Sequence, residues 1–283
     1  MIKDKKLFAV CFFTGLSGIA VFYLIPFISV IIDAFTVSAD NNLKIFGAGN
    51  FIKLFKNGVF WTAMKNTGVF TVIVVLSVNL SAFIIAGMIK YFVDNTFILS
   101  VIILPLSVPT IVTAAIFGDR IITDLTRIIN IFAASFADTV RGEYAFLLTV
   151  LIYLWKYTGF HALIYIMALS TVPPEQYDAA SLDGASVYKK FRYIILPCIT
   201  PFIWFSVLLS VMNSFKIFKD IYILFGDYPP PDVYLLQHFI QNNFIKLNLG
   251  YVFCSVCIFL GILIAIFTPL IIKGNITEKY YDE

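Results

Sequence analysis

Charge is what this sequence has least of. Only 13% of its 283 residues are Asp, Glu, Lys or Arg, whereas 60% are hydrophobic. Soluble domains average about 25% charged residues, so this chain has too little polar surface to cover a compact water-soluble fold. The mean hydropathy of +0.91 points the same way. The composition therefore excludes a soluble globular protein and predicts a membrane protein.

Residues that carry metal or acid–base chemistry are also scarce. The two histidines, His161 and His238, lie far apart, and no pair of acidic residues falls within one apolar run. The four cysteines all lie in apolar stretches, where a thiol behaves as a small hydrophobe. We therefore expect Cys254 and Cys257 to pack rather than to bind a metal. An intramembrane hydrolase would lack the groups it needs, and a net charge of +3 on scattered residues does not favour a nucleic-acid partner.

What the sequence does contain is a series of apolar runs, each long enough to cross a bilayer, which takes about 20 residues. The first run follows Lys3, Lys5 and Lys6, but it is too long for a signal peptide and no Ala-x-Ala site closes it. We expect an all-α, polytopic chain whose residues 1–283 form one transmembrane domain. An even number of spans with basic clusters inside predicts both termini in the cytoplasm, although a count of Lys and Arg over all connections does not settle orientation. The six predicted spans are approximately 7–32, 66–89, 97–118, 144–172, 198–224 and 248–272.

Polar side chains within the spans follow helical faces. Lys156 lies near the middle of the fourth span, where a charge costs about 2.5–3.5 kcal/mol and usually faces a cavity or a partner or snorkels to an interface. Both ends of the span are about twelve residues or more away, so we expect Lys156 to face a cavity. In the fifth span one stripe recurs at helical spacing and consists of Ser206, Ser210, Asn213, Ser214 and Ile217. Small polar residues also hold membrane helices together, so each Ser is open to a packing role or a pathway role.

The connection 173–197 between the fourth and fifth spans has the pattern of two short helices. Pro173 and Pro174 suit a helix start, and Glu175 places negative charge at its positive end. Gly184 is suited to a left-handed turn between the two helices. Pro197 then marks the end of the second. From the residues alone, this segment is a bent, polar interfacial loop.

The same segment carries a specific resemblance. Glu-x-Tyr-Asp-Ala-Ala-x-x-Asp-Gly-Ala over 175–185, followed by Phe191 and Leu196-Pro197, resembles the "EAA" loop of ABC importer permeases. The form of the motif is similar to the carbohydrate branch, the maltose and glycerol-3-phosphate type permeases. Two positions depart from the family pattern: Asp178 replaces the usual Glu, and 225–231 replaces a Gly-Gly-Pro.

The resemblance implies a six-helix type I ABC importer permease in a bacterial plasma membrane. Its partners would be a second homologous permease, an ABC ATPase dimer and an extracellular solute-binding protein. The chain has no Gly-x-x-x-x-Gly-Lys-Ser/Thr phosphate loop, so ATP and Mg²⁺ would bind to the ATPase and the chain itself would not be an enzyme. The residues implied in ATPase coupling are Glu175, Tyr177, Asp178, Ala179, Ala180, Asp183, Gly184, Ala185, Phe191, Leu196 and Pro197.

The resemblance also implies a solute path along the fifth span, for sugars or oligosaccharides. An alternative is a phosphorylated polyol or another non-sugar solute, with Lys156 meeting an anion. In a further alternative, the second permease holds the whole site and this chain only packs against it. The expected pathway residues are Lys156, Tyr157, Tyr153, Ser210, Asn213, Ser214 and Ile217.

Overall fold

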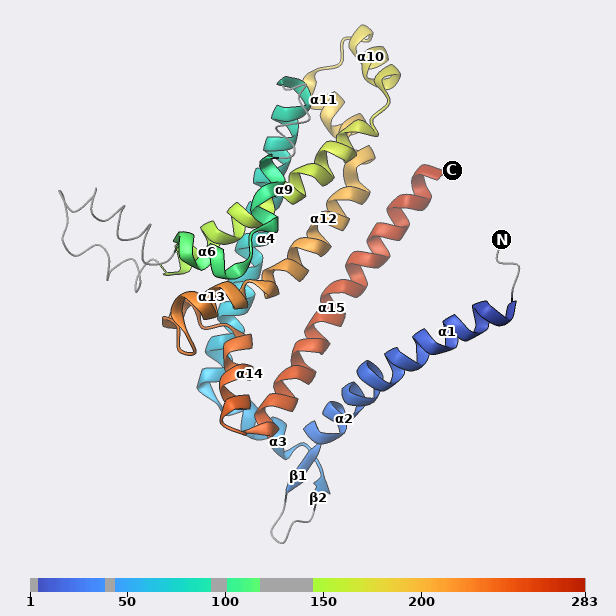
Figure 1. Cartoon of the computed structure of the whole chain (residues 1–283). Coiled ribbons are helices and arrows are strands. Elements are labelled where there is room, and N and C mark those ends of the chain that lie inside the picture. Colours follow the sequence, from blue (N-terminus) through green and yellow to red (C-terminus); the bar gives the residue numbers. More distant parts are fainter. Residues whose placement is uncertain (1–4, 39–43, 93–100, 118–144, 283) are drawn as a thin grey trace, which may run out of the picture. The chain divides into compact units, whose positions relative to one another are not determined.

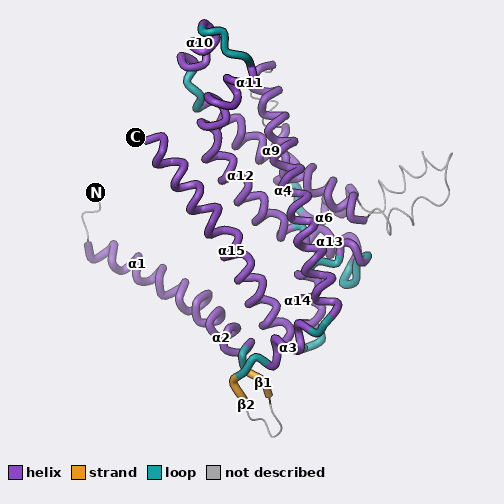
Figure 2. The backbone as a smooth tube through the Cα atoms, turned by 180° about the vertical axis from the view of Figure 1, so that it is seen from behind, coloured by secondary structure: helices purple, strands orange, loops and turns teal. Residues whose placement is uncertain are grey.

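The computed structural model describes residues 5–38, 44–92, 101–117 and 145–282, and these are almost entirely helical (Figures 1 and 2). The strands within these ranges are β1 (Thr36–Ser38) and β2 (Lys44–Phe46), which pair antiparallel with Val37 opposite Ile45. Five helical stretches are long and apolar enough to cross a membrane, which confirms a multi-pass protein. They are Val10–Ala34, Gly58–Lys90, Ala145–Ser170, Val187–Phe225 and Leu249–Pro269.

The chain divides into two compact units, residues 1–61 with 239–263, and residues 62–238 with 264–283. In the first unit, α1 (Lys5–Ile19), a π-helical turn (Ala20–Leu24) and α2 (Ile25–Ala34) follow one another without a break. The hairpin of β1 and β2 then leads into α3 (Gly49–Phe55). Asn50 ties this corner together by donating to the carbonyl oxygen of Thr36 at 2.9 Å.

Three long helices form the core of the second unit. They are α4 (Gly58–Phe92), α9 (Ala145–Ser170) and α12 (Leu196–Lys216). Residues four apart in the sequence lie on the same face of α4. One such stripe is buried, and the stripe on the opposite face is exposed. The buried stripe is Phe70, Val74, Val78, Ala82 and Ala86, and the exposed stripe is Val72, Leu76, Leu80, Ile84 and Met88.

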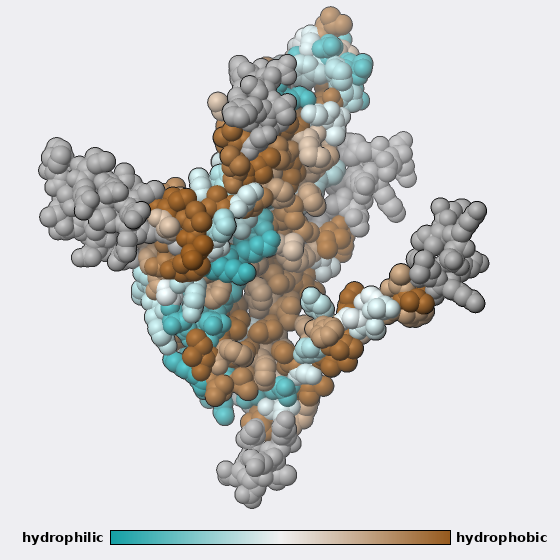
Figure 3. Space-filling model, in the orientation of Figure 1, coloured by the Kyte–Doolittle hydropathy of each residue, from teal (hydrophilic) through white to brown (hydrophobic). Residues whose placement is uncertain are grey.

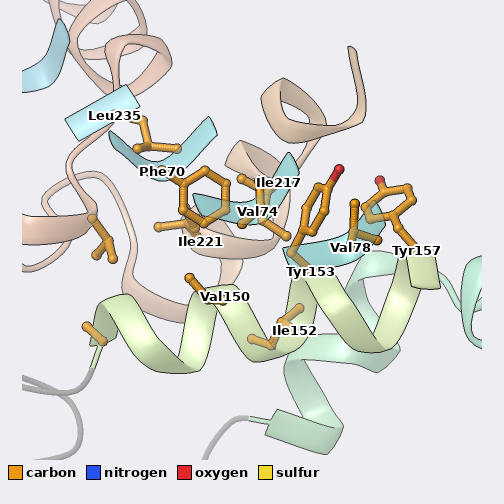
Figure 4. Close-up of a cluster of buried hydrophobic side chains, with 12 residues drawn as sticks. Phe70, Val74, Val78, Val150, Ile152, Tyr153, Tyr157, Ile217, Ile221 and Leu235 are labelled. Carbon is orange, nitrogen blue, oxygen red and sulfur yellow. The ribbon is translucent and has the colours of Figure 1, made fainter. Parts of the chain in front are cut away.

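The buried stripe packs against α9 and against the segment that follows α12. Figure 4 shows Phe70, Val74 and Val78 facing Tyr153 of α9 and Ile217. Hydrophobic side chains also cover much of the visible surface of the long helices, as Figure 3 shows. Apolar residues on both the inner and the outer face are what a helix needs when lipid, not water, surrounds the bundle.

The predicted third span is interrupted at its two prolines. Its described part, residues 101–117, is broken into a short 3-10 turn (Leu104–Ser107) and α6 (Thr110–Phe117), with Pro105 and Pro109 at the break. Proline removes a backbone donor and disrupts the helix. Only residues 101–117 of this predicted span lie within the described ranges, and this stretch is not among the five candidate spans found there.

The remaining boundaries shift by several residues. The second predicted span lies within the longer helix α4, and the sixth begins one residue before α15 (Leu249–Asp282), which continues beyond it. The fifth contains two helices, because α12 ends at Lys216 and α13 (Phe218–Phe225) begins after Ile217. A 3-10 turn (Pro231–Val233) and α14 (Leu236–Ile245) then complete the connection to α15.

Candidate functional site

The charge in the fourth span has a partner. The Lys156 ammonium group on α9 lies 2.9 Å from Oδ1 and 3.1 Å from Oδ2 of Asp220 on α13. Both residues are buried, with exposed fractions of 6% and 2%. Lys156 was expected to face a cavity, but in the structure it is buried and paired with a carboxylate of the same chain. Asp220 was missed, although an acidic residue inside the predicted fifth span was a signal for a counter-ion.

A second polar group joins α4, α9 and α12, and Asn79 of α4 is its centre. The Asn79 side-chain oxygen accepts hydrogen bonds from Ser206 Oγ and from the Tyr165 hydroxyl, both at 2.7 Å. Its amide nitrogen donates to Ser210 Oγ at 3.0 Å. No role for Asn79 was predicted from the sequence, although an amide side chain inside the predicted second span was a signal for one. One amide thus uses both its acceptor and its donor to hold three helices together.

His161 extends this group from α9. Its Nδ1 lies 2.8 Å from Ser206 Oγ. Because the Ser206 hydroxyl hydrogen is donated to Asn79, Nδ1 carries the proton in this pair and Nε2 is left as an acceptor. Within the described part of the chain, Nε2 of His161 is buried without a hydrogen-bond partner.

The structure buries all of the predicted pathway residues, which lie on α9, on α12 and at the end of α12. The Tyr153 hydroxyl donates to the Ser210 carbonyl oxygen at 2.8 Å, and Ser214 Oγ lies 3.1 Å from Thr71 Oγ1 of α4. The Asn213 side-chain oxygen accepts from Lys216 at 2.9 Å. None of the set is more than 6% exposed: Lys156, Tyr157, Tyr153, Ser210, Asn213, Ser214 and Ile217. In this state the polar stripe of α12 joins helices of its own chain.

The connection 173–197 bends at Gly184 as its sequence predicts, but its second helix does not end at Pro197, because a proline in the first turn of α12 is compatible with a continuous helix. The first helix is α10 (Pro174–Leu182), and the second, α11 (Val187–Lys190), continues through a π-helical segment (Phe191–Ile195) into α12. Gly184 has a φ of 71°, the left-handed conformation that favours glycine. Its N–H donates to Ser181, and the next N–H, of Ala185, donates to Ala180 at 2.9 Å. This pair of bonds is a Schellman motif, which closes α10 and fixes the direction of the turn.

The loop has an exposed tip and a packed base (Figures 1 and 3). Leu182, at the end of α10, is 89% exposed, whereas the ring of Phe191 lies 6.1 Å from that of Phe83 on α4. Of the predicted coupling residues, the exposed ones are Glu175, Asp178, Ala179, Asp183 and Gly184. Those that are partly buried are Tyr177, Ala180, Ala185, Phe191, Leu196 and Pro197. The tip is thus open to a partner while the base is anchored in the bundle.

The first unit contains a separate cleft of about 710 Å³. It lies between the end of α2, the strand β1, the helix α3 and the start of α15. Its polar lining includes Asp33, Asn50, Lys53 and Asn248. None of the residues expected in coupling or in the solute path lines it.

Comparison with known proteins places these features in a family. A family model described as "binding-protein-dependent transport system inner membrane component" matches residues 84–273. The arabinooligosaccharides transport system permease protein AraP of Bacillus subtilis (strain 168) is 27% identical over 275 residues, covering 93% of this chain and 86% of that protein. The lactose transport system permease protein LacF of Rhizobium radiobacter is 26% identical over 211 residues, covering 72% of this chain and 71% of that protein.

A solved structure shares the fold. A chain of the bacterial alginate ABC transporter, crystallised in complex with an alginate pentasaccharide-bound periplasmic protein, superimposes with a TM-score of 0.74. The match is 19% identical in sequence and covers 99% of this chain and 96% of that chain. The family match spans more than half of the chain, and the fold agrees with it. This chain therefore belongs to the binding-protein-dependent transport system inner membrane components, the multi-pass permeases of ABC transporters.

Proposed function

We propose that this chain is one permease subunit of an ATP-driven importer of sugars or oligosaccharides. Its partners in this proposal are a second homologous permease, an ATPase dimer that binds ATP and Mg²⁺, and an extracellular solute-binding protein. The relatives named for arabinooligosaccharides and lactose support a carbohydrate solute. The observation that carries the proposal is the connection 173–197, which has an exposed tip and runs directly into a membrane-spanning helix.

The coupling step follows from the shape of this loop. The exposed tip at α10 would lie in a groove of the ATPase, with small residues such as Ala179 permitting close contact. Because α11 and α12 belong to one helical stretch, Val187–Phe225, a displacement of the loop would be transmitted along the helix axis. The spans would then rock between inward-facing and outward-facing states when the ATPases close on ATP.

The solute path in this proposal runs along the interface of α9 and α12. Tyr153, Tyr157 and Asn213 offer aromatic rings and an amide, and these groups suit sugar faces and hydroxyls. Because these residues are buried, they would meet a solute only when the helices part. The proposed site is therefore a property of the open state, and the hydrogen bonds of Ser210 and Ser214 to α4 describe the closed one.

The ion pair of Lys156 favours a neutral solute over an anionic one. The Lys156 ammonium group is already paired with both oxygens of Asp220, so an anionic solute would have to bind beside the negative charge of that carboxylate. The charge of this pair is zero. The phosphorylated polyol is for this reason the weaker candidate.

The proposal is tested in vesicles that contain the whole transporter, by measuring uptake of a labelled oligosaccharide and ATP hydrolysis in the same sample. Gly184→Pro should break the Schellman motif, so ATP hydrolysis continues while uptake falls. Gly184→Asn is the milder comparison, since Asn tolerates the left-handed conformation. Normal uptake by Gly184→Pro would contradict the coupling role.

The solute path has its own test in the same vesicles. Asn213→Ala combined with Ser214→Ala should lower uptake while leaving ATPase assembly intact. Unchanged uptake would assign the whole site to the second permease.

A further inference from the structure

The two helices of the connection 173–197 are joined by little backbone. Only residues 183–186 link the end of α10 at Leu182 to the start of α11 at Val187. The Schellman motif sets the direction of the turn, but it uses backbone atoms of α10 and of the turn alone. A side chain that connects α10 to α11 would help to transmit a displacement of α10 to α12.

Lys190, the last residue of α11, makes that connection. Its ammonium group donates to Ser181 Oγ at 2.6 Å and lies 4.6 Å from the centre of the Tyr177 ring. Ser181 and Tyr177 are four residues apart, so they share one face of α10. The ammonium group therefore contacts α10 at two points on the same face, one polar and one aromatic.

The chemistry of Ser181 matches this contact. Its hydroxyl hydrogen is donated to the carbonyl oxygen of Tyr177 at 2.8 Å, which leaves the oxygen lone pairs free to accept. A lysine ammonium group is a donor only, so the hydrogen bond runs from Lys190 to Ser181 Oγ. The aromatic face of Tyr177 attracts the same cation.

The backbone of Lys190 belongs to the spanning helix. Its N–H donates to Ser186 at 3.0 Å, within the first turn of α11. From Val187 the chain stays helical as far as Lys216, the end of α12. A displacement of α10 that is passed to Lys190 is thus passed to the helix that carries Asn213.

We propose that Lys190 is a positioning residue, a strut that makes α10 and α11 move as one body and so transmits ATPase closure to α12. The inference rests on the proposed function for its link to ATP. The structural part, that Lys190 fastens α10 to α11, stands on the contacts with Ser181 and Tyr177 alone.

The first test measures solute molecules imported per ATP hydrolysed by the complete transporter in vesicles. Lys190→Met keeps the approximate length of the side chain and removes its charge. We expect the ratio to fall about fivefold, because one exposed cation–π contact and one hydrogen bond are lost. Lys190→Arg keeps a cation and a donor and should restore most of the ratio. Lys189→Met changes the neighbouring lysine, which makes neither contact, and should match the unaltered transporter.

Two results of this first test would overturn the inference. One is an unchanged ratio in Lys190→Met. The other is loss of the ATPase from the purified Lys190→Met complex, because Lys190 would then be a direct contact with the ATPase rather than a strut.

The second test needs no transport and separates this inference from the proposed function. Backbone hydrogen exchange of residues 174–182 is compared between the unaltered complex and Lys190→Met. The strut predicts faster exchange in α10 when Lys190 is changed, and no difference with Lys189→Met. Equal exchange in all three would contradict the strut, whereas absence of ATP-driven uptake in the unaltered transporter would contradict only the proposed function.

Discussion

At the scale of the residue, the spans tolerate charge because it is paired. Lys156 and Asp220 are both buried, and the Lys156 ammonium nitrogen lies within 3.1 Å of both carboxylate oxygens of Asp220. Breaking a buried pair leaves an uncompensated charge and typically costs about 3–5 kcal/mol, whereas replacing both members by apolar residues is often neutral. The pair therefore has a stability signature that differs from that of a solute-binding lysine.

The single variants Lys156→Met and Asp220→Leu should each unfold at a clearly lower temperature in detergent, because each leaves one buried charge alone. The double variant should recover most of the loss. Thermal unfolding of the three proteins is the measurement. A double variant as unstable as the singles would show that the pair does more than neutralise charge.

His238, which lies between the candidate spans, gives the fold a pH dependence. The ring is fully buried, and its Nδ1 accepts a hydrogen bond from the N–H of Leu235 at 3.2 Å. Burial lowers the pKa of His238 from 6.5 to about 4, against the opposing effect of the nearby Asp227. Because the folded state binds the proton more weakly than the unfolded state, stability is complete above pH 6.5 and falls as the pH drops toward 4.

The size of this loss is at most about 1.4 kcal/mol per pH unit across that window. Unfolding by denaturant at pH 7.5 and pH 5 should show lower stability at the lower pH for the unaltered chain. His238→Gln has no ring to protonate and should show a smaller difference between the two pH values. Equal differences in both proteins would assign the pH dependence to other groups.

At the scale of the element, close backbone approach fixes the broken segment 101–117 onto α9. A Cβ atom at Gly159 would overlap the carbonyl group of Ile102, which is backbone and has no side-chain freedom to move away. Glycine at 159 therefore has a packing reason, although it lies inside a helix where it costs about 1 kcal/mol relative to alanine.

Gly159→Ala should destabilise the protein by displacing the backbone near Ile102. The matched control is Gly68→Ala, since a Cβ at Gly68 in α4 meets no atom within 4 Å and alanine favours a helix. Thermal unfolding should place Gly159→Ala well below the unaltered chain and Gly68→Ala at or above it. The same unfolding temperature for both variants would show that the approach to Ile102 does not constrain the fold.

The elements differ in how readily their sequence predicts them. The length of the apolar runs was enough to predict α4, α9 and α15, because the thickness of the bilayer sets the length of any helix that crosses it. Pro105 and Pro109 interrupt the apolar run within residues 101–117, and α12 gives way to α13 at Ile217 within one candidate span. The bend at Gly184 was predictable because a left-handed residue leaves a local signal.

The partners of buried polar groups were not predictable in the same way. Lys156 and Asp220, or Asn79 and Ser206, are far apart in the sequence, and helix packing alone decides that they meet. The polar stripe of α12 was correctly placed on one face, but two roles for it were open. In this state, contacts within the chain occupy Ser206, Ser210 and Ser214. Their expected contact with a solute stays a prediction.

At the scale of the whole molecule, the chain is a multi-pass permease of the binding-protein-dependent transport family. Family membership and the shared fold establish the permease, and the exposed tip of the connection 173–197 is where an energy source would act. In the proposal, the connection 173–197 receives a displacement and α12 transmits it. The buried polar interface of α9 and α12 would then open. It requires that transport depend on ATP and on a binding protein.

The most direct measurement is uptake of a labelled neutral oligosaccharide into vesicles that contain this chain, its second permease and the ATPase. The account predicts uptake only when ATP is present on the loop side and the solute-binding protein on the other, with a phosphorylated sugar excluded. Uptake without ATP, or uptake that favours the phosphorylated sugar, would contradict it.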